Sequence, residues 1–486
     1  MATAAPLSLQ LQSSLHHAHE QLCDAEEQFD LLRHTVDGWS AWPLIRFEVS
    51  FMLAGLTFDH RSVVSRAKRV RRAVQDLPRL ARLGPARHLI QTYSSGLVEL
   101  DGDRYRDMWF DDVALPAGST FKIETLNNPR FAVLSDQAHA PRDVSGAPFD
   151  ICAAILRRVR PSRDVVDVAA QFSRVIRGPL NLPDVDEEWV ARRLYRFSSL
   201  RSVYAALLRR VRPSYVLVVN ASHHGLMAAA REHGAIVLEL QHGIADRSHA
   251  SYSWSASAAR YRPMMPVPDR LLLYGEYWKG ELSGSGFWGE NLRVVGSPRL
   301  DRYRRKGRTR DQTPRRIVFT TQGLDRARVG VFLTQFLERL GNTVPCRLAI
   351  KLHPIYDVDK APYLEAFRPF LDRVDVIGGD EWPSTFELLR DAHVHVSIAS
   401  ASHYDAVGLG IPTVILPFTS HEIVLPLHRA GHAWLARTPE DLATVVRLPQ
   451  MPRLAPEIGE YYFQPGARAN ILRELDIEPS ATDEGS

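Results

Sequence analysis

The chain has 486 residues, of which 45% are apolar and 24% are charged, and its net charge is +4. This length exceeds what a single hydrophobic core supports, so two domains are expected. The small net charge does not indicate nucleic acid as a partner, and no run of about 18 apolar residues predicts a membrane-spanning helix. The N-terminus lacks the pattern of a secretory signal, and the three scattered cysteines form neither a disulfide framework nor a metal cluster. A cytoplasmic location is therefore expected.

Residues 1–88 are predicted to form a helical N-terminal extension. Apolar residues recur with helical spacing from Leu7 to about Arg33. The segment Arg61–Arg82 combines many arginines with interspersed valines and leucines. Its simplest interpretation is a solvated helix face. The alternative is a surface that docks on anionic lipid head groups or on a charged glycan, which would give the protein a peripheral contact with the inner face of the plasma membrane.

Strand and helix patterns alternate from residue 89 onward, which is typical of doubly wound α/β domains. Residues 89–300 are predicted as the first such domain. Within it, the valine-rich, largely apolar run Tyr215–Asn220 is typical of a buried parallel strand. The other strands are expected at Leu89–Tyr93, Phe131–Ser135, Ala235–Leu240, Arg270–Tyr274 and Leu292–Val295, and helices at Ser198–Val211 and Ser222–His233.

The polar, basic stretch 301–314 has no apolar periodicity and is predicted as a linker between domains. Residues 315–476 then repeat the α/β pattern, and the acidic tail 477–486 is predicted to be disordered. The strands expected in this half are Arg316–Thr320, Arg347–Lys351, Val374–Ile377, Val394–Ile398 and Thr413–Leu416. The predicted fold class is therefore α/β, with two Rossmann-like domains that face a cleft and a helical extension before them.

The first half carries histidines at two predicted strand ends. In open α/β sheets, ligands bind at the carboxyl ends of the strands. Gln241-His242-Gly243 follows one strand directly. The glycine lets the backbone approach a ligand, and the histidine can act as a general base because its ordinary pKa lies near neutrality. His224 lies in the turn after Tyr215–Asn220. The simpler interpretation of a lone His-Gly pair is a histidine that caps the strand end.

The second half carries two further strand-end patterns. In Lys351-Leu352-His353-Pro354, proline forces an extended backbone on the histidine, so that the imidazole points out of the strand end, where a phosphate could bind. Ser400 and Ser402 stand where a helix is expected to begin, and the free N–H groups there favour phosphate. Asp405 lies about one turn further on and could accept ribose hydroxyls. An ordinary serine N-cap is the simpler interpretation of this segment.

Four segments occur in a recognisable order: Leu240-Gln241-His242-Gly243, Gly296-Ser297-Pro298-Arg299, Lys351-Leu352-His353-Pro354 and Ser400–Pro412. Together they resemble bacterial surface-polysaccharide transferases of GT-B type, which include capsule-polysaccharide glycosyltransferases, bacterial polysialyltransferases and the CDP-glycerol glycerophosphotransferases of teichoic acid synthesis. The resemblance covers roughly Tyr215–Leu416. Gln241 stands where the glycerophosphotransferases usually have tryptophan, which favours the capsule-type branch, and the acidic base motif of the polysialyltransferases is not found.

The resemblance implies a glycosyltransferase that moves a sugar from a nucleotide-activated donor to a glycan or lipid-linked acceptor of capsule or lipopolysaccharide type. It implies His242 and His353 as catalytic residues, with His242 as the base that deprotonates the acceptor. The residues implied at the donor nucleotide are Lys351, His353, Ser400, Ser402 and Asp405, and those on the acceptor side are Gln241, Gly243 and His224. No metal ion and no cofactor are expected, because such enzymes usually need none and no Asp-x-Asp motif stands at a strand end.

Three other functions remain open. A CDP-polyol phosphotransferase of teichoic-acid type would use the same strand-end histidines. A nucleotide-sugar 2-epimerase would share the fold but would have no use for the basic segment Arg61–Arg82. A non-catalytic glycan-binding partner would not need His242, His353, Ser400 and Asp405 together.

Overall fold

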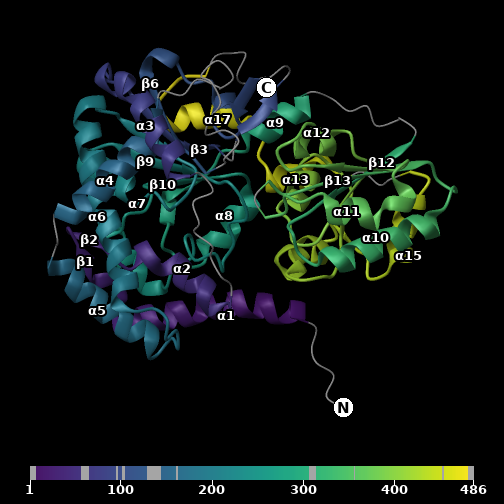
Figure 1. Cartoon of the computed structure of the whole chain (residues 1–486), viewed down its shortest axis with the longest axis horizontal. Coiled ribbons are helices and arrows are strands. Elements are labelled where there is room, and N and C mark those ends of the chain that lie inside the picture. The colour runs from purple at the N-terminus through teal and green to yellow at the C-terminus, as the bar shows by residue number, and fades with distance from the viewer. Residues whose placement is uncertain are drawn as a thin grey trace. The chain divides into compact units, whose positions relative to one another are not determined.

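The computed structural model describes residues 7–55, 65–94, 97–100, 104–127, 144–159, 163–305, 314–354, 356–450 and 454–479 (Figure 1). Within these residues the chain divides into two units. The first comprises Ser14–Val295 together with Arg468–Pro479, and the second comprises Gly296–Ala467 together with Leu7–Ser13. The strand Phe131–Ser135 expected from the sequence lies outside the described residues.

A parallel sheet forms the centre of the first unit. Its strands are β3 (His88–Tyr93), β6 (Thr120–Thr125), β7 (Val144–Ser145), β8 (Tyr215–Val218), β9 (Ile236–Leu240), β10 (Arg270–Leu273) and β11 (Leu292–Val294). Their order across the sheet is β11-β10-β9-β8-β3-β6-β7, and every neighbouring pair is parallel. Two short antiparallel pairs lie outside this sheet, β1 (Thr35–Val36) with β2 (Trp39–Ser40) and β4 (Leu97–Leu100) with β5 (Arg104–Asp107).

Helices surround this sheet, and the longest of them shows how the sequence sets its limits. The helices are α1 (Leu7–Phe29), α2 (Pro43–Leu53), α3 (Arg66–Ala81), α4 (Ala147–Val159), α5 (Arg163–Arg177), α6 (Glu187–Val211), α7 (His224–Glu232), α8 (Glu276–Ser283) and α17 (Ala467–Glu474). Helix α6 begins where the carboxylate of Asp186 accepts a hydrogen bond from the N–H of Trp189 at 2.7 Å. It ends at Arg212, whose φ of 50° is left-handed. Its Leu208 packs in one apolar cluster with Val216 of β8.

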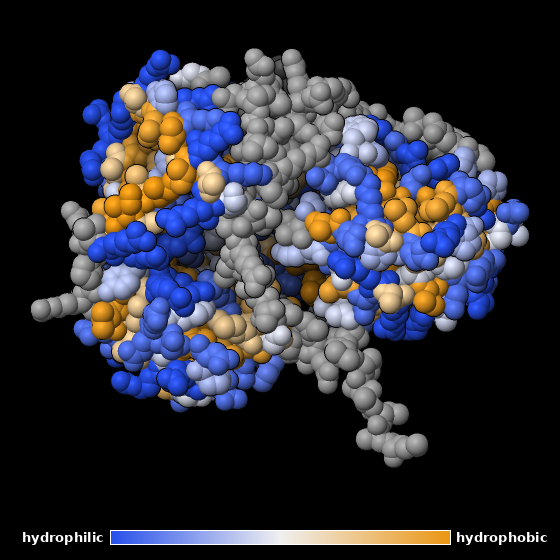
Figure 2. Space-filling model, viewed as in Figure 1, coloured by the Kyte–Doolittle hydropathy of each residue, from blue (hydrophilic) through white to orange (hydrophobic). Residues whose placement is uncertain are grey.

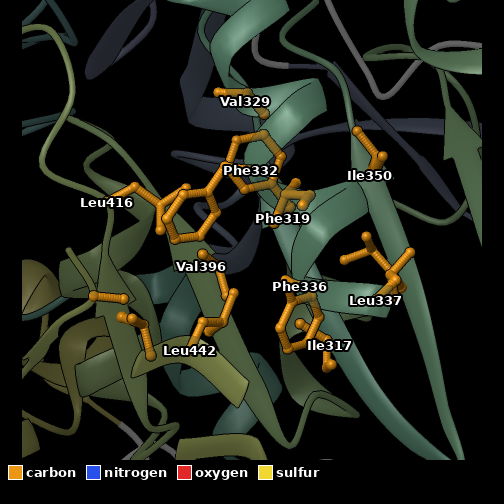
Figure 3. Close-up of a cluster of buried hydrophobic side chains, with 14 of the residues drawn as sticks. Ile317, Phe319, Val329, Phe332, Phe336, Leu337, Ile350, Val396, Leu416 and Leu442 are labelled. Atoms are coloured by element: carbon orange, nitrogen blue, oxygen red, sulfur yellow. The ribbon is translucent and has the colours of Figure 1, made fainter. Parts of the chain in front are cut away.

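The second unit has its own parallel sheet and core. The strands are β12 (Arg315–Thr320), β13 (Cys346–Lys351), β14 (Val374–Ile377), β15 (Val394–Ser397), β16 (Thr413–Ile415) and β17 (Trp434–Leu435). They lie in the order β14-β13-β12-β15-β16-β17, with parallel neighbours throughout. The helices are α9 (Pro298–Arg305), α10 (Arg326–Leu340), α11 (Ala361–Ala366), α12 (Thr385–Arg390), α13 (Ser402–Gly408), α14 (Leu425–Arg429), α15 (Pro439–Arg447) and α16 (Pro456–Tyr462). Phe332 and Phe336 of α10 pack on Phe319 of β12 and Val396 of β15 (Figure 3). The predicted α/β fold, with two Rossmann-like domains after a helical extension, is confirmed.

The stretch 301–314 differs from the linker that the sequence indicated. Its first residues belong to α9, and residues 306–313 lie outside the described part. The Arg304 guanidinium donates from Nε to the carbonyl of Gly408 at 3.0 Å, from Nη1 to that of Phe463 at 3.0 Å and from Nη2 to that of Gly459 at 3.2 Å. Arg304, which the sequence indicated as solvated, therefore connects α9 to α13 and to α16 and the residue that follows it.

The end of the chain also departs from the predicted domain limits. Residues 468–479 belong to the first unit rather than to the second, and they include the first residues of the stretch expected as a disordered tail. The amide Nδ2 of Asn470 donates to the carbonyl of Val295 at 3.1 Å, and the Tyr215 hydroxyl donates to the carboxylate of Asp476. Residues 480–486 lie outside the described part.

Two kinds of feature are not found among the described residues. No helix there is both long and apolar enough to cross a membrane. In the same part of the chain, no group of three or more His, Cys, Asp or Glu side chains is arranged to hold a metal ion.

Candidate functional site

The carboxyl ends of β12, β13, β14 and β15 meet at one edge of the second sheet because these strands are parallel neighbours. This edge collects most of the residues that the sequence singled out in the second half. Thr321 follows β12, His353 follows β13, and Ser400 and Ser402 follow β15. Strand ends of this kind are where open α/β sheets bind ligands.

Lys351, the last residue of β13, holds a neighbouring loop. Its side chain is 2% exposed, and Nζ donates to the carbonyl of Gly378 at 2.7 Å and to that of Glu381 at 2.6 Å. Burial lowers its pKa to about 8. Because two of the three ammonium protons are bonded to carbonyls, Lys351 connects the ends of β13 and β14. These bonds give Lys351 a role in positioning beside its predicted contact to the nucleotide phosphate.

The same loop packs tightly on the His-Pro turn. A Cβ at Gly379 would lie 2.4 Å from the nitrogen and the Cα of Pro354, so only glycine fits there. The proline and the glycine thus fix the backbone that carries His353. This close packing explains how a short turn can fix the orientation of the His353 imidazole.

His353 is held in a single neutral form. Its backbone N–H donates to Oγ1 of Thr321 at 3.2 Å, and its Nδ1 accepts from the backbone N–H of Tyr356 at 3.1 Å. The ring stacks on that of Tyr356, with the centroids 4.5 Å apart. Burial lowers the pKa to about 4. Since Nδ1 is an acceptor, the neutral imidazole carries its proton on Nε2 and can donate it to an anion without being charged.

Ser400, Ser402 and Asp405 lie at the beginning of α13. The backbone N–H of Ser402 donates to Oγ of Ser400 at 3.1 Å, so this hydroxyl shapes the turn into the helix. Asp405 is 8% exposed, and its Oδ1 lies 3.7 Å from Nη2 of Arg299. Burial raises the pKa of Asp405 to about 6, while Arg299 acts in the opposite direction. The guanidinium also lies 4.0 Å from the ring centroid of Phe386.

Arg299 was not among the predicted site residues, and its motif was assigned to the first domain. The structure instead brings Gly296-Ser297-Pro298-Arg299 to the second unit, beside α13. Two sequence signals mark the start of α9: Pro298 at its first position, and Ser297 before it, whose Oγ accepts from the backbone N–H of Leu300 at 3.3 Å.

The sequence also gave no sign of a chain of buried polar groups behind this edge. His395 bonds through Nε2 to Oγ1 of Thr320 at 2.9 Å and through Nδ1 to Oγ1 of Thr413 at 2.8 Å. The same threonine oxygen lies 2.6 Å from Nδ1 of His403. Burial lowers the pKa of both histidines far below the ordinary value, so both are neutral. These hydrogen bonds cross β12, β15 and β16 and link the three strands to one another.

In the first unit, Gln241 braces the turn that presents His242. It is 1% exposed, its Nε2 donates to the carbonyl of Gly243 at 2.8 Å, and its Oε1 accepts from the backbone N–H of Tyr274 at 2.8 Å. Both ends of the amide are therefore bonded within the protein. His224, the first residue of α7, is likewise occupied, since its Nδ1 lies 2.9 Å from the carbonyl of Pro266. These contacts give Gln241 and His224 structural tasks beside their predicted place on the acceptor side.

His242 is half-buried at the end of β9. Its Nδ1 is buried and makes no hydrogen bond within the described residues. Burial lowers its pKa to about 4, His249 lowers it further, and the backbone of Val219 acts in the opposite direction. The imidazole is therefore neutral near pH 7 and able to accept a proton. A pKa this low makes a weak base, and a nearby anionic ligand would strengthen it.

A buried carboxyl group, which the sequence did not single out, lies two residues before Gln241. Glu239 is fully buried and accepts a hydrogen bond at 2.5 Å from the hydroxyl of Tyr252. Burial raises its pKa to about 8, against the effect of hydrogen bonds from Tyr252 and the backbone of Ala221. Glu239 is thus a neutral acid near pH 7.

The N-terminal helices support the loop that follows His242. Arg46 of α2 forms an ion pair with Glu26 of α1, and both side chains are fully buried. Arg46 also donates to the carbonyl of Ala250 and, at 2.8 Å, to that of Ser253. That loop carries His249, whose ring stacks on Tyr252 with the centroids 4.4 Å apart. The extension is therefore an integral part of the first unit.

No family model and no curated protein matches this chain. Its fold is similar to that of the UDP-GlcNAc 2-epimerase of Neisseria meningitidis bound to UDP-GlcNAc, with 13% identity and a TM-score of 0.49 over 80% of this chain and 99% of that one. It is also similar to MurG of Acinetobacter baumannii, with 14% identity and a TM-score of 0.43 over 80% and 99% of the two chains. A third similar structure is the wall teichoic acid polymerase TagF, with 11% identity and a TM-score of 0.39 over 86% and 92%. Identities and TM-scores this low do not assign an activity.

Proposed function

We propose that the chain is a glycosyltransferase of GT-B type that moves a sugar from a nucleotide-activated donor to a surface-polysaccharide acceptor of capsule or lipopolysaccharide type, without a metal ion. The observation that carries the proposal is the carboxyl edge of the second sheet, where β13 leads to a neutral Nε2–H donor on His353 and β15 leads to the Ser400–Ser402 turn, with β12 between these two strands. Uncharged donors at converging strand ends suit the phosphates of a nucleotide.

In the proposed reaction, an acceptor hydroxyl attacks the anomeric carbon of the donor. The bond between that carbon and the phosphate oxygen breaks, the nucleotide leaves with the bonding electron pair, and the hydroxyl proton passes to His242. His353 and the turn at Ser402 stabilise the charge that develops on the leaving phosphate. Lys351 and Gln241 act by holding the two turns, and Asp405 with Arg299 forms the wall beside the serines.

Nucleotide binding is the first test. Thermal unfolding of the full chain is measured with UDP, CDP, GDP and CMP. A ligand present at 100 times its Kd stabilises the protein by about 2.7 kcal/mol. One nucleotide is expected to raise the melting temperature clearly above the other three. If all four leave it unchanged, the transferase proposal fails.

Two variants of His353 form a matched pair for the second test. Asparagine places its amide oxygen near the position of Nδ1 and keeps the contact with the N–H of Tyr356, whereas glutamine places its amide nitrogen near that of Nε2. His353→Asn is expected to weaken nucleotide binding at least about tenfold, the value of one lost hydrogen bond to a charged group. His353→Gln should retain more of the affinity. Wild-type binding by both variants would remove His353 from the site.

His242 is tested by transfer rather than by binding. His242→Ala should keep nucleotide affinity and lose release of the nucleotide from its sugar donor in the presence of a glycan primer. Full activity of this variant would exclude His242 as the base. Consumption of a CDP-polyol with no nucleotide sugar turned over would replace the proposal by a phosphotransferase, and interconversion of a nucleotide sugar without primer would replace it by an epimerase.

A further inference from the structure

Helix α3 buries two charged side chains and exposes three large apolar ones, unlike an ordinary surface helix. The side chains that it buries include the charged residues Arg72 and Asp76, whereas Val70, Val74 and Leu77 are 45%, 59% and 55% exposed. Scattered single apolar residues are normal on a protein surface, but a contiguous exposed apolar row is not. Positions 70, 74 and 77 are spaced by four and three residues, so they lie along one face of the helix.

The buried contacts of Asp76 explain why charged side chains of α3 face the interior of the domain. Asp76 is fully buried and accepts hydrogen bonds from the backbone N–H of Ser145 at 2.8 Å and from its hydroxyl at 2.5 Å. Its other oxygen lies 3.5 Å from Nε of Arg72 and 4.0 Å from Nη1 of Arg79. The charged groups hold the helix on the domain, and the apolar row is left facing outward.

The apolar row continues onto the neighbouring helix. Ala73 of α3 packs on Ala147 and Ile151 of α4. One turn beyond Ile151 stands Ile155, which is 57% exposed. The space-filling view shows an apolar area over α3 and α4, at the upper left, with hydrophilic surface around it (Figure 2). We define the apolar patch as Val70, Val74, Leu77 and Ile155.

The exposed charged side chains of the two helices that carry the apolar patch are basic, and we call them the basic border. On α3 the exposed charged residues are Arg66, Lys68 and Arg71, and on α4 they are Arg157 and Arg158. The one acidic residue of α3 is the buried Asp76. An exposed apolar row with a basic border is the composition of helices that lie in the interface of an anionic membrane, where the apolar side chains enter the acyl boundary and the cations meet phosphate head groups.

We propose that α3 and α4 form a membrane-docking surface whose partner is a bilayer with anionic phospholipids. The apolar patch inserts, and its basic border provides the preference for negative charge. The proposal does not depend on the transferase activity, because it is read from a different face of the first unit and is tested without substrate. It would bring the protein to an acceptor held in a membrane.

The test is sedimentation of the full chain with vesicles of phosphatidylcholine alone and of phosphatidylcholine mixed with phosphatidylglycerol. The wild type should bind only the mixed vesicles, and added salt should weaken binding because it screens the basic border. Equal binding to both kinds of vesicle, or binding to neither, would overturn the proposal.

Two triple variants separate the contributions. Arg66→Gln, Lys68→Gln and Arg71→Gln together should weaken binding about a hundredfold, since each basic residue near an anionic surface contributes roughly a factor of five. Val70→Ser, Val74→Ser and Leu77→Ser keep all charges and should weaken binding at least about tenfold.

The matched control is Val331→Ser on α10, because Val331 is 59% exposed, as Val74 is. This variant should bind vesicles as the wild type does, and all variants should keep the wild-type melting temperature. If the serine triple variant leaves vesicle binding unchanged, the apolar patch has no role in docking. If instead the wild type dimerises without vesicles and the serine variant does not, the patch is a protein contact and the membrane proposal is wrong.

Discussion

Replacing Arg46 with methionine tests whether the buried ion pair holds the N-terminal helices to the loop after His242. Methionine fills much of the same volume but leaves the fully buried carboxylate of Glu26 without its cation. It also removes the donor to the carbonyls of Ala250 and Ser253. Removing one partner of a buried pair costs about 3–5 kcal/mol, so the first unit should lose that much of its free energy of unfolding.

The assay is urea unfolding followed by tryptophan fluorescence, because Trp42, Trp278 and Trp288 are fully buried in the first unit and report its unfolding. The control is Arg368→Met, which breaks the pair with Glu365 on the surface, where the two side chains are 73% and 68% exposed. Such a pair contributes at most about 1 kcal/mol.

A double variant shows whether the cost comes from the uncompensated charge. Arg46→Met combined with Glu26→Leu leaves no buried charge, and it should recover a large part of the lost stability. A loss below about 1 kcal/mol for Arg46→Met alone, or a double variant as unstable as the single one, would refute the view that this pair fastens the helices to the loop.

Three further predictions concern single buried groups. Because the pKa of Glu239 is raised from 4.5 to about 8, the stability that its proton provides is complete below pH 4.5 and is lost as the pH rises to about 8. Glutamine has the shape of the neutral acid, so the stability of Glu239→Gln relative to the wild type should increase within that window, by at most about 1.4 kcal/mol per pH unit. Urea unfolding at a series of pH values measures this difference, and a difference that does not change with pH would contradict the prediction. Gly296→Ala should lower the melting temperature of the second unit, since φ is +91° and the added Cβ would lie 2.1 Å from the carbonyl oxygen of Gln464. Lys351→Met should cost about 1–3 kcal/mol, because the buried carbonyl of Gly378 loses its donor, whereas the carbonyl of the exposed Glu381 can bond to water. Faster hydrogen exchange is expected in residues 378–381, and unchanged exchange there would show that Lys351 does not hold the loop.

Most strands of the two parallel sheets could be predicted from the sequence because their signal is local, but β6, β7 and β17 were not expected. The run Tyr215–Val218 is apolar and buried, and the strand ends at Leu240 and Lys351 fall where the sequence placed them. Buried parallel strands need continuous apolar runs, and such runs are visible without knowledge of any partner.

Contacts between distant residues left no such signal. Arg304 looked like one more basic residue of a linker, yet the carbonyls that it binds are on Gly408, Gly459 and Phe463. Asp76 similarly reads as a solvated charge in a basic helix, although it is fully buried and holds Ser145. A charged side chain is buried only when partners compensate it, and the partners come from the fold rather than from neighbouring positions.

The same reasoning explains why Arg299 was assigned to the first domain, although it belongs to the second unit. In the sequence the segment Gly296–Arg299 follows the strands of the first half, so it was counted with them. At Gly296, however, the chain turns with a left-handed φ against the carbonyl of Gln464, a turn that only glycine makes without strain. The helix that starts at Pro298 then carries Arg299 to Asp405, and the pairing at 3.7 Å joins two motifs that lie about 100 residues apart. If Arg299 serves the donor wall, as this pairing implies, Arg299→Lys should impair nucleotide binding while leaving the first unit as stable as before, because Arg299 belongs to the second unit.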